Sequence, residues 1–354
     1  MSIRRGRGAT DNRTSARFNL PAQEADGDWL DAREDVDGGA PKLRTTVTVH
    51  QPRTIIARNT SPDVGFSQSI NAYAGCEHGC IYCFARPTHA HHDLSPGLDF
   101  ETRLIAKPNA ATLLRKELAK PGYVVQTIAM GTNTDPYQPI ESEWRITRDC
   151  IAVLAACRHP LMITTKSDRV TRDIDLLGPM AADGLVAVGI SLTTLDPALA
   201  RRMEPRAAHP ARRLAAITRL RAAGIPVYAC ISPIIPAIND HEIEALVAAA
   251  ADAGALGVSN IPVRLPHEVA PLFRAWLDSH FPDRAAKVMH IIQQIRGGRD
   301  NDPNFGTRMR GQGPYAELIR VRMDKARRRH GLEGTRVALR HDLFEAPGGQ
   351  MRLF

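Results

Sequence analysis

The sequence lacks a long apolar run. Its 354 residues contain no stretch of the roughly 18 consecutive apolar residues that a membrane-spanning helix requires. The first 20 residues are charged and lack the apolar segment of a secretory signal peptide. We therefore expect a cytoplasmic protein without a membrane partner. In that reducing compartment, clustered cysteines indicate metal binding or catalysis and not disulfides.

Aromatic residues and lysine are also scarce. Phe, Trp and Tyr make up 5% of the chain, which argues against a nucleic-acid surface built on extended base stacking. Only 7 of the 46 basic residues are lysines, and the 38 acidic residues leave a formal net charge of +8. This balance favours a polyanionic partner. The hydrophobic fraction of 43% excludes wholesale disorder.

Short apolar runs alternate with helical patterns from about residue 66 onward. The expected strands cover residues 66–72, 124–130, 161–165, 186–192, 227–231 and 257–261, and the expected helices cover 109–120, 147–156, 172–182, 210–223 and 240–253. This alternation predicts an α/β fold with a parallel sheet. Short connections favour a partial (β/α)6 barrel, similar to a TIM barrel, over a doubly wound sheet, although the pattern alone does not decide between them. Functional residues of such barrels gather at the C-terminal ends of the strands.

The chain divides into four segments by composition. We predict a flexible polar and basic N-terminal arm over residues 1–60, the barrel over 61–282, a helical basic extension over 283–345 and a tail over 346–354. Between residues 296 and 340, 12 basic and 5 acidic residues leave a charge of +7, nearly the whole excess. This concentration favours a surface that contacts phosphates, with a solvated helix as the alternative.

Three of the six cysteines form the sharpest motif. Cys76, Cys80 and Cys83 have the spacing C-x3-C-x2-C and follow the first expected barrel strand. Three thiolates so close together need a cation, and both zinc and iron–sulfur clusters bind thiolates. A zinc site would need a fourth ligand, for which four histidines are candidates: His78, His89, His91 and His92. The absence of a second CxxC pair argues against zinc, and a [4Fe–4S] cluster with three Cys ligands leaves one iron open for a cofactor.

This loop, placed after the first strand of a βα chain, resembles that of the radical S-adenosylmethionine (SAM) superfamily. The resemblance implies that the three cysteines hold a [4Fe–4S] cluster whose open iron binds SAM. It also implies an electron donor of the flavodoxin or ferredoxin type. Reductive cleavage of SAM then gives methionine and a 5′-deoxyadenosyl radical that abstracts hydrogen from the substrate. Tyr82, the aromatic residue before the last cysteine, would lie against the adenine.

Further strings resemble one subgroup of this superfamily. They are residues 83–89 (CFARPTH), 131–141 (GTNTDPYQPIE) and 204–207 (EPRA), and they are similar to radical SAM proteins related to spore photoproduct lyase, often labelled DNA repair photolyase. The resemblance implies a lyase or base-modifying enzyme that acts on DNA. Two alternatives stay open: a radical SAM enzyme acting on RNA, protein or a small molecule, and a zinc-stabilised DNA-binding protein without catalysis.

The same resemblance implies a set of SAM-binding residues at the ends of the strands. Thr132, Asn133, Thr134 and Asp135 would receive the amino group of SAM, with a capped turn as the alternative. Lys166 would lie near the carboxylate or ribose, and Ser191 would reach the same ligand. Glu204 and Arg206 would hold ribose hydroxyls or clamp a carboxylate, the alternative being an ion pair between these two on the surface.

One departure leaves the catalytic residues unassigned. Spore photoproduct lyase returns hydrogen to its substrate from a cysteine after the second strand, whereas residues 124–141 contain no cysteine. Cys150, Cys157 and Cys230 lie in an expected helix, at its end and in an expected strand, where cysteine commonly serves as a small hydrophobic residue. Tyr137 is a candidate radical relay.

The last residues resemble a docking peptide. Gln350, Met351, Leu353 and Phe354 are similar to the Gln-Leu-x-Leu-Phe motif that binds the bacterial DNA sliding clamp, with Met351 as a departure. A flexible Pro-Gly-Gly segment precedes them. The motif predicts that the tail docks in a groove of the clamp, and a tail that folds back on its own domain is the alternative.

Overall fold

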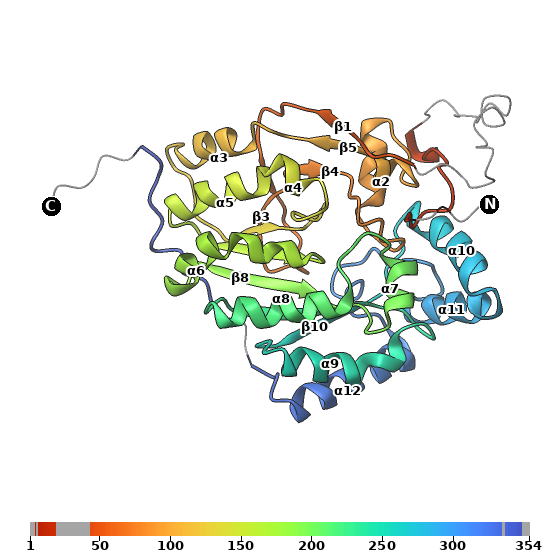
Figure 1. Ribbon diagram of the computed structural model, residues 1–354. Helices are drawn as coiled ribbons and strands as arrows, with labels where there is room; N and C mark the ends of the chain where they lie inside the picture. Colours follow the sequence, from red (N-terminus) through yellow and green to blue (C-terminus); the bar gives the residue numbers. More distant parts are fainter. Residues whose placement is uncertain (1–3, 5, 19–42, 335–336, 349–354) are drawn as a thin grey trace.

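The computed structural model describes residues 4, 6–18, 43–334 and 337–348. Its main element is a seven-stranded sheet with the order β10-β9-β8-β7-β6-β3-β2 (Figure 1). The strands are β2 (Ile56–Arg58), β3 (Gln68–Ile70), β6 (Ile128–Met130), β7 (Leu161–Thr165), β8 (Val186–Ser191), β9 (Val227–Ile234) and β10 (Val258–Pro262). All neighbours pair in parallel except β2 and β3, which are antiparallel. The predicted α/β fold with a parallel sheet is therefore confirmed.

From β3 to β10 the strands follow chain order without a reversal. Each crossover contains a helix. These helices are α3 (Ala110–Leu118), α4 (Glu141–Trp144), α5 (Ile146–Ala156), α6 (Ile174–Ala182), α7 (Pro197–Met203), α8 (Pro210–Ala222) and α9 (Ile243–Asp252). Short 3-10 turns η3 (Asp168–Asp173) and η4 (Asp240–Glu242) precede α6 and α9. A doubly wound sheet would reverse its strand order at a switch point, and this sheet does not.

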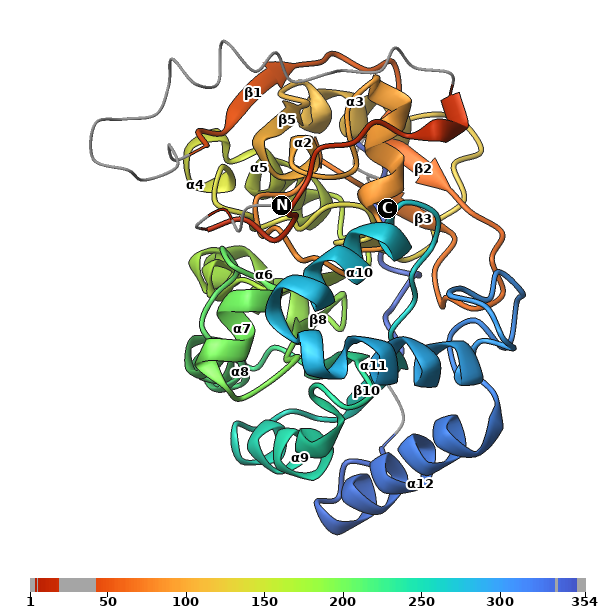
Figure 2. The same ribbon diagram turned by 90° about the vertical axis from the view of Figure 1, so that its right-hand side faces the viewer.

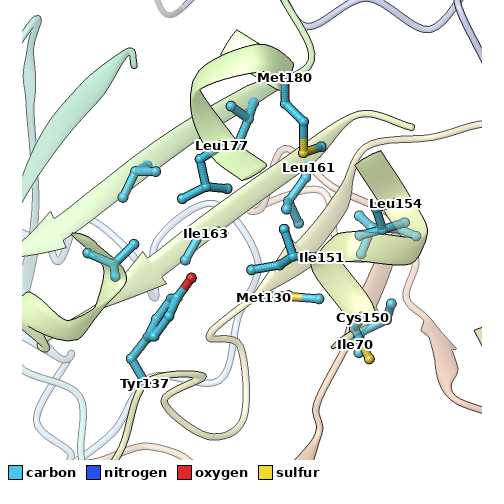
Figure 3. Packing of buried hydrophobic residues seen from close by; sticks show 14 of the residues in the cluster. Ile70, Met130, Tyr137, Cys150, Ile151, Leu154, Leu161, Ile163, Leu177 and Met180 are labelled. Carbon is cyan, nitrogen blue, oxygen red and sulfur yellow. The ribbon is translucent and has the colours of Figure 1, made fainter. Parts of the chain in front are cut away.

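The main core lies between the sheet and these helices. Ile163 on β7 packs with Ile151 and Leu154 from α5 and with Leu177 and Met180 from α6 (Figure 3). Such residues recur every three or four positions along each helix, so one face of the helix is apolar and covers the sheet. This core fixes the strand ends, and with them the loops that carry the candidate site.

A second, three-stranded sheet carries the cysteine loop. Its order is β1 (Thr46–Val49), β5 (Arg103–Ala106) and β4 (Tyr73–Ala74). The cysteines follow β4 and lead into the 3-10 helix η2 (Arg86–His92) and the short helix α2 (Asp99–Thr102). The loop is thus supported by its own small sheet, which is separate from the main one.

The beginning of the chain differs from the predicted flexible arm. Residues 6–18 run along the cysteine loop and α2 and end in the 3-10 turn η1 (Ala16–Phe18). Ala9 is 1% exposed and Ser15 is 2% exposed. The arm is ordered here because its backbone makes hydrogen bonds to the folded domain, and a polar composition does not reveal such bonds.

The predicted helical extension contains α11 (Pro282–Ile295) and α12 (Gly313–Arg329), which follow α10 (Val269–His280). Residues 337–348 then cross the opposite side of the molecule. The Arg340 N–H donates to the carbonyl oxygen of Gly184 at 3.0 Å, and the Glu345 N–H donates to that of Cys157 at 2.9 Å. Both acceptors come just before a strand, so this segment covers the N-terminal ends of the strands. The predicted docking residues Gln350, Met351, Leu353 and Phe354 lie outside the described residues.

Candidate active site

The cysteine loop is a tight, buried turn. Cys76 and Cys80 are each 7% exposed, and Cys83 is partly buried. Gly79 turns the chain with a φ of 67°, which glycine adopts readily. A Cβ atom at Gly79 would lie 2.7 Å from Oε2 of Glu101, so the close packing of the loop also requires glycine.

The three thiols form a mutually interacting set. Burial is the main cause that raises the pKa of each thiol. Asp135 and then the other two thiols raise the pKa of Cys76 further. Such a group ionises only beside a cation, and this donor set therefore fits a thiolate-bound iron–sulfur cluster. In the part of the chain that the structure describes, no group of three or more His, Cys, Asp or Glu side chains is placed so that it could hold a single metal ion.

A buried charged cluster lies beside the cysteine loop. Glu204, which follows α7, accepts hydrogen bonds from the Tyr82 hydroxyl and from Arg213 on α8, and one of 2.6 Å from Thr193 Oγ1. Burial alone would raise the pKa of Glu204, but Arg213 and Lys166 lower it to about 2. Glu204 is therefore an anion at neutral pH.

Lys166 faces this cluster from the end of β7. Its Nζ lies 3.9 Å from Glu204 Oε1 and 5.8 Å from the centre of the Tyr82 ring. Burial would lower the pKa of Lys166, but Glu204 and Cys80 raise it, so the side chain stays cationic. The structure thus brings together Tyr82, Lys166 and Glu204, three of the predicted SAM-binding residues.

The loop after β6 joins two strand ends. Asp135 accepts hydrogen bonds from Thr165 Oγ1 at 2.6 Å and from the Lys166 N–H at 2.8 Å. Burial would raise the pKa of Asp135, but His78 lowers it to about 2. Its Oδ2 lies 3.3 Å from His78 Nδ1 of the cysteine loop. Asp135 therefore ties the loop after β6 to both β7 and the cysteines.

The other predicted residues of that loop also have protein partners. Thr134 Oγ1 donates to the Gly75 carbonyl oxygen at 2.6 Å. The Thr132 hydroxyl bonds to Asn71, and the Asn133 amide donates to Thr88 Oγ1 at 3.2 Å. These bonds hold the loop against residues on both sides of the cysteines, and a role of its side chains in binding SAM stays a prediction.

Ser191 and Arg206 have different surroundings. Ser191 ends β8 and is 5% exposed, and its carbonyl oxygen accepts a bond from Arg213 Nη1 at 3.1 Å. Arg206 lies 3.0 Å from Glu77 Oε1. The alternative pair of Glu204 with Arg206 does not form, because Glu204 pairs with Arg213 and Arg206 with Glu77.

Sequence patterning missed Arg213, Glu77 and Thr193. Arg213 carried a usable signal, because it shares one helical face with Ile217 and Leu220, and all three are buried. An arginine on an apolar face indicates a buried acidic partner. Glu77 and Thr193 gave no comparable signal.

The remaining cysteines and Tyr137 lie elsewhere. Cys150 and Cys157 belong to the main hydrophobic core, and Cys230 is partly exposed on β9. Tyr137 is fully buried and donates to Asp173 Oδ2 at 3.0 Å (Figure 3). Tyr137 therefore supports the loop after β6 from the core side.

The basic extension has fewer free cations than its composition suggests. Arg308 pairs with Asp63, Arg320 with Glu317 and Asp324, Arg322 with Glu244, Arg327 with Asp324 and Arg340 with Asp342. Arg296 is buried and donates to backbone carbonyl groups. Within the described residues, Lys325, Arg328 and Arg329 form no ion pair and stay exposed at the end of α12.

Comparisons with known proteins assign this site to a family. Residues 70–250, just over half of the chain, match the radical SAM superfamily. The chain belongs to this superfamily. As a radical SAM enzyme, it uses a [4Fe–4S] cluster and SAM. Family membership also sets aside the zinc-stabilised, non-catalytic alternative. No helix among the described residues is long and apolar enough to cross a membrane.

Relatives of this radical SAM enzyme occur in distant organisms. An uncharacterized protein of Mycobacterium tuberculosis is 36% identical over 253 residues, which cover 70% of this chain and 74% of the relative. One of Methanocaldococcus jannaschii is 31% identical over 178 residues, covering 50% of this chain and 64% of the relative.

Among solved structures, spore photoproduct lyase complexed with a dinucleoside spore photoproduct has the same fold. The TM-score is 0.55 at 15% identity, over 80% of this chain and 79% of the lyase. A mutant of that lyase with bound AdoMet and the same dinucleoside spore photoproduct has a TM-score of 0.54. At this identity the similarity shows the fold alone.

Proposed function

We propose that this radical SAM enzyme acts on DNA, repairing a lesion or modifying a base. The observation that carries the proposal is the fold similarity over 80% of the chain to a lyase complexed with a dinucleoside photoproduct. The sequential strand order, without reversal, supports a partial barrel around the substrate. A flipped base entering such a barrel also requires contacts between the protein and the nucleic-acid backbone outside it.

Cys76, Cys80 and Cys83 would hold the cluster. When bound, the cluster and SAM supply the 5′-deoxyadenosyl radical chemistry of hydrogen abstraction. The electron would come from a flavodoxin- or ferredoxin-type donor. The protein's own task is to hold SAM in one orientation in a site closed to water.

Lys166 and Glu204 would set that orientation. The Lys166 ammonium group is cationic and mostly buried, so it would bind the SAM carboxylate strongly. Glu204 forms an ion pair with Lys166, and the hydrogen bond from its hydroxyl to Glu204 fixes Tyr82. The fixed Tyr82 ring would lie against the adenine. Thr132, Asn133, Thr134, Asp135, Ser191 and Arg206 would shape the rest of the SAM site.

A second candidate function is a radical SAM reaction on RNA, a protein or a small molecule. The ion pairing of the basic extension favours a protein or small-molecule substrate over either nucleic acid. Five of its arginines are neutralised by nearby carboxylates, which reduces the field that would attract a polyanion.

Deuterium transfer distinguishes these candidates. Anaerobically reduced protein is incubated with SAM and with damaged oligonucleotides that carry deuterium at the base or sugar. We expect deuterium in 5′-deoxyadenosine for at least one DNA lesion, and none with the Cys80→Ala variant as the control. Release of unlabelled 5′-deoxyadenosine with every DNA, alongside transfer from RNA or a peptide, would support the second candidate.

A further inference from the structure

The N-terminal segment 6–17, which we call the strap, packs directly on the cysteine loop. The N–H groups of Gly8 and Ala9 donate to the two carboxylate oxygens of Glu101 at 2.9 and 2.8 Å. Ala9 shares a hydrophobic cluster with Cys80 and Tyr82. The strap therefore contacts the loop through apolar surface, and its backbone is hydrogen-bonded to Glu101 of α2.

Glu101 connects the strap to the backbone of the loop. It is fully buried and pairs with Arg86, also fully buried, at 2.5 Å. Arg86 in turn donates to the carbonyl oxygens of Cys80 at 2.9 Å and Gly79 at 3.2 Å. One chain of contacts thus runs from the strap through two buried charges to the cysteines.

The packing leaves no space between strap and loop. A Cβ atom at Gly8 would lie 1.9 Å from the Gly79 carbonyl oxygen. A Cβ atom at Gly97 would lie 2.3 Å from the carbonyl oxygen of Asp11. Both distances are shorter than any real contact, so these backbones touch only because the positions are glycine.

The strap also joins two parts of the molecule that are far apart in the sequence, α2 and the start of α10. Its middle exchanges two hydrogen bonds with α2, between Asn12 and Asp99, at 2.8 and 2.9 Å. Its end reaches α10, where Ser15 and Arg17 bond to Glu268. In Figure 2 the strap, drawn in red, crosses in front of α2 and above α10. It therefore links the connection after the first strands to the helix after β10.

We propose that the strap is part of the cluster site: it closes the outer side of the cysteine loop and, through Glu101, positions the loop for cluster binding. Glu101 is a positioning residue, since it acts on the cysteines through Arg86 and the strap. The proposal goes beyond the DNA function and does not depend on it. It predicts that retention of the cluster depends on residues about 70 positions before the cysteines.

The test measures iron loss without any substrate. Gly8→Ala places a methyl group against the Gly79 carbonyl and should displace the strap. Gly65→Ala is the matched control, because a Cβ there meets nothing within 4 Å. In anaerobic, reduced holoprotein with a ferrous chelator, we expect iron loss about tenfold faster for Gly8→Ala and unchanged for Gly65→Ala.

Asn12→Ala provides a second, milder variant if Gly8→Ala does not fold. It removes both bonds to Asp99 without changing a residue of the cysteine loop, and should speed iron loss about threefold. The electron paramagnetic resonance signal of the reduced cluster should also change, which a general loss of stability would not produce. Wild-type iron loss and an unchanged signal, in a variant whose strap is cleaved faster by trypsin, would overturn the proposal.

Discussion

Glu204 is the central charged residue of the site. Its carboxylate is buried between two cations, Arg213 and Lys166, and accepts bonds from Tyr82 and Thr193. Because the pairing lowers its pKa to about 2, it stabilises the fold above the ordinary glutamate pKa of about 4.3. That stabilisation is lost as the pH falls toward 2.

Removing this carboxylate should be costly. Glu204→Ala leaves two buried cations unpaired, and breaking a buried pair in this way costs about 3–5 kcal/mol. Urea unfolding of the cluster-free protein measures the effect. Glu317→Ala is the control, because Glu317 pairs with Arg320 on an exposed helix face, where a pair contributes about 0–1 kcal/mol. Equal losses for the two variants would contradict this account of the site.

At the scale of elements, α12 shows how a helix uses its charges. Ala316, Ile319, Met323 and Ala326 form its buried stripe, and Arg322 pairs with Glu244 on α9. Arg322 therefore fixes the helix to its neighbour, whereas Arg320 and Arg327 pair with carboxylates of α12 itself. The exposed cations without a described ion pair are Lys325, Arg328 and Arg329 in its last turns.

These three residues should carry any DNA contact of α12. Each phosphate contact contributes about 0.9 to the slope of log affinity against log salt. Replacing Lys325, Arg328 and Arg329 by Gln should therefore reduce that slope by roughly 2–3, measured by fluorescence anisotropy with duplex DNA. The paired variant Arg320→Gln is the control and should leave the slope unchanged. A slope that stays the same in the triple variant would remove α12 from the DNA interface.

At the scale of the whole molecule, the site and residues 337–348 lie on opposite sides. The cysteine loop, α7 and α10 lie on one side, and residues 337–348 run past α6 on the other (Figure 1). The latter segment is held by Phe344, whose ring packs near Tyr123 and His159.

The clamp-like tail can be tested directly. A pull-down with bacterial sliding clamp should retain the full chain and lose it when Leu353 and Phe354 are deleted, because these are the apolar anchors of the motif. Replacement of Arg352 by Ala, at the variable position of the motif, is the control. Undiminished retention after the deletion would refute docking through the tail.

Local sequence determined the order of the elements and the metal-binding motif. The six predicted strands correspond to β3 and β6–β10, because hydrophobic periodicity is a property of neighbouring residues. The three cysteines could be recognised because eight consecutive residues contain the whole motif. Tyr82, Lys166 and Glu204 could be proposed as SAM-binding residues because the loops that carry them follow the motif or a predicted strand, or match the subgroup's strings.

The partners of these residues were decided by the tertiary structure. The pairing of Glu204 with Arg213, the attachment of the strap to Glu101 and the pairing of Arg322 on α12 with Glu244 on α9 join residues from separate elements. Composition counts charges but does not show which carboxylate lies opposite each arginine. Whether a polar segment is flexible, or a cation is free, depends on contacts that exist only once distant parts of the chain have packed together.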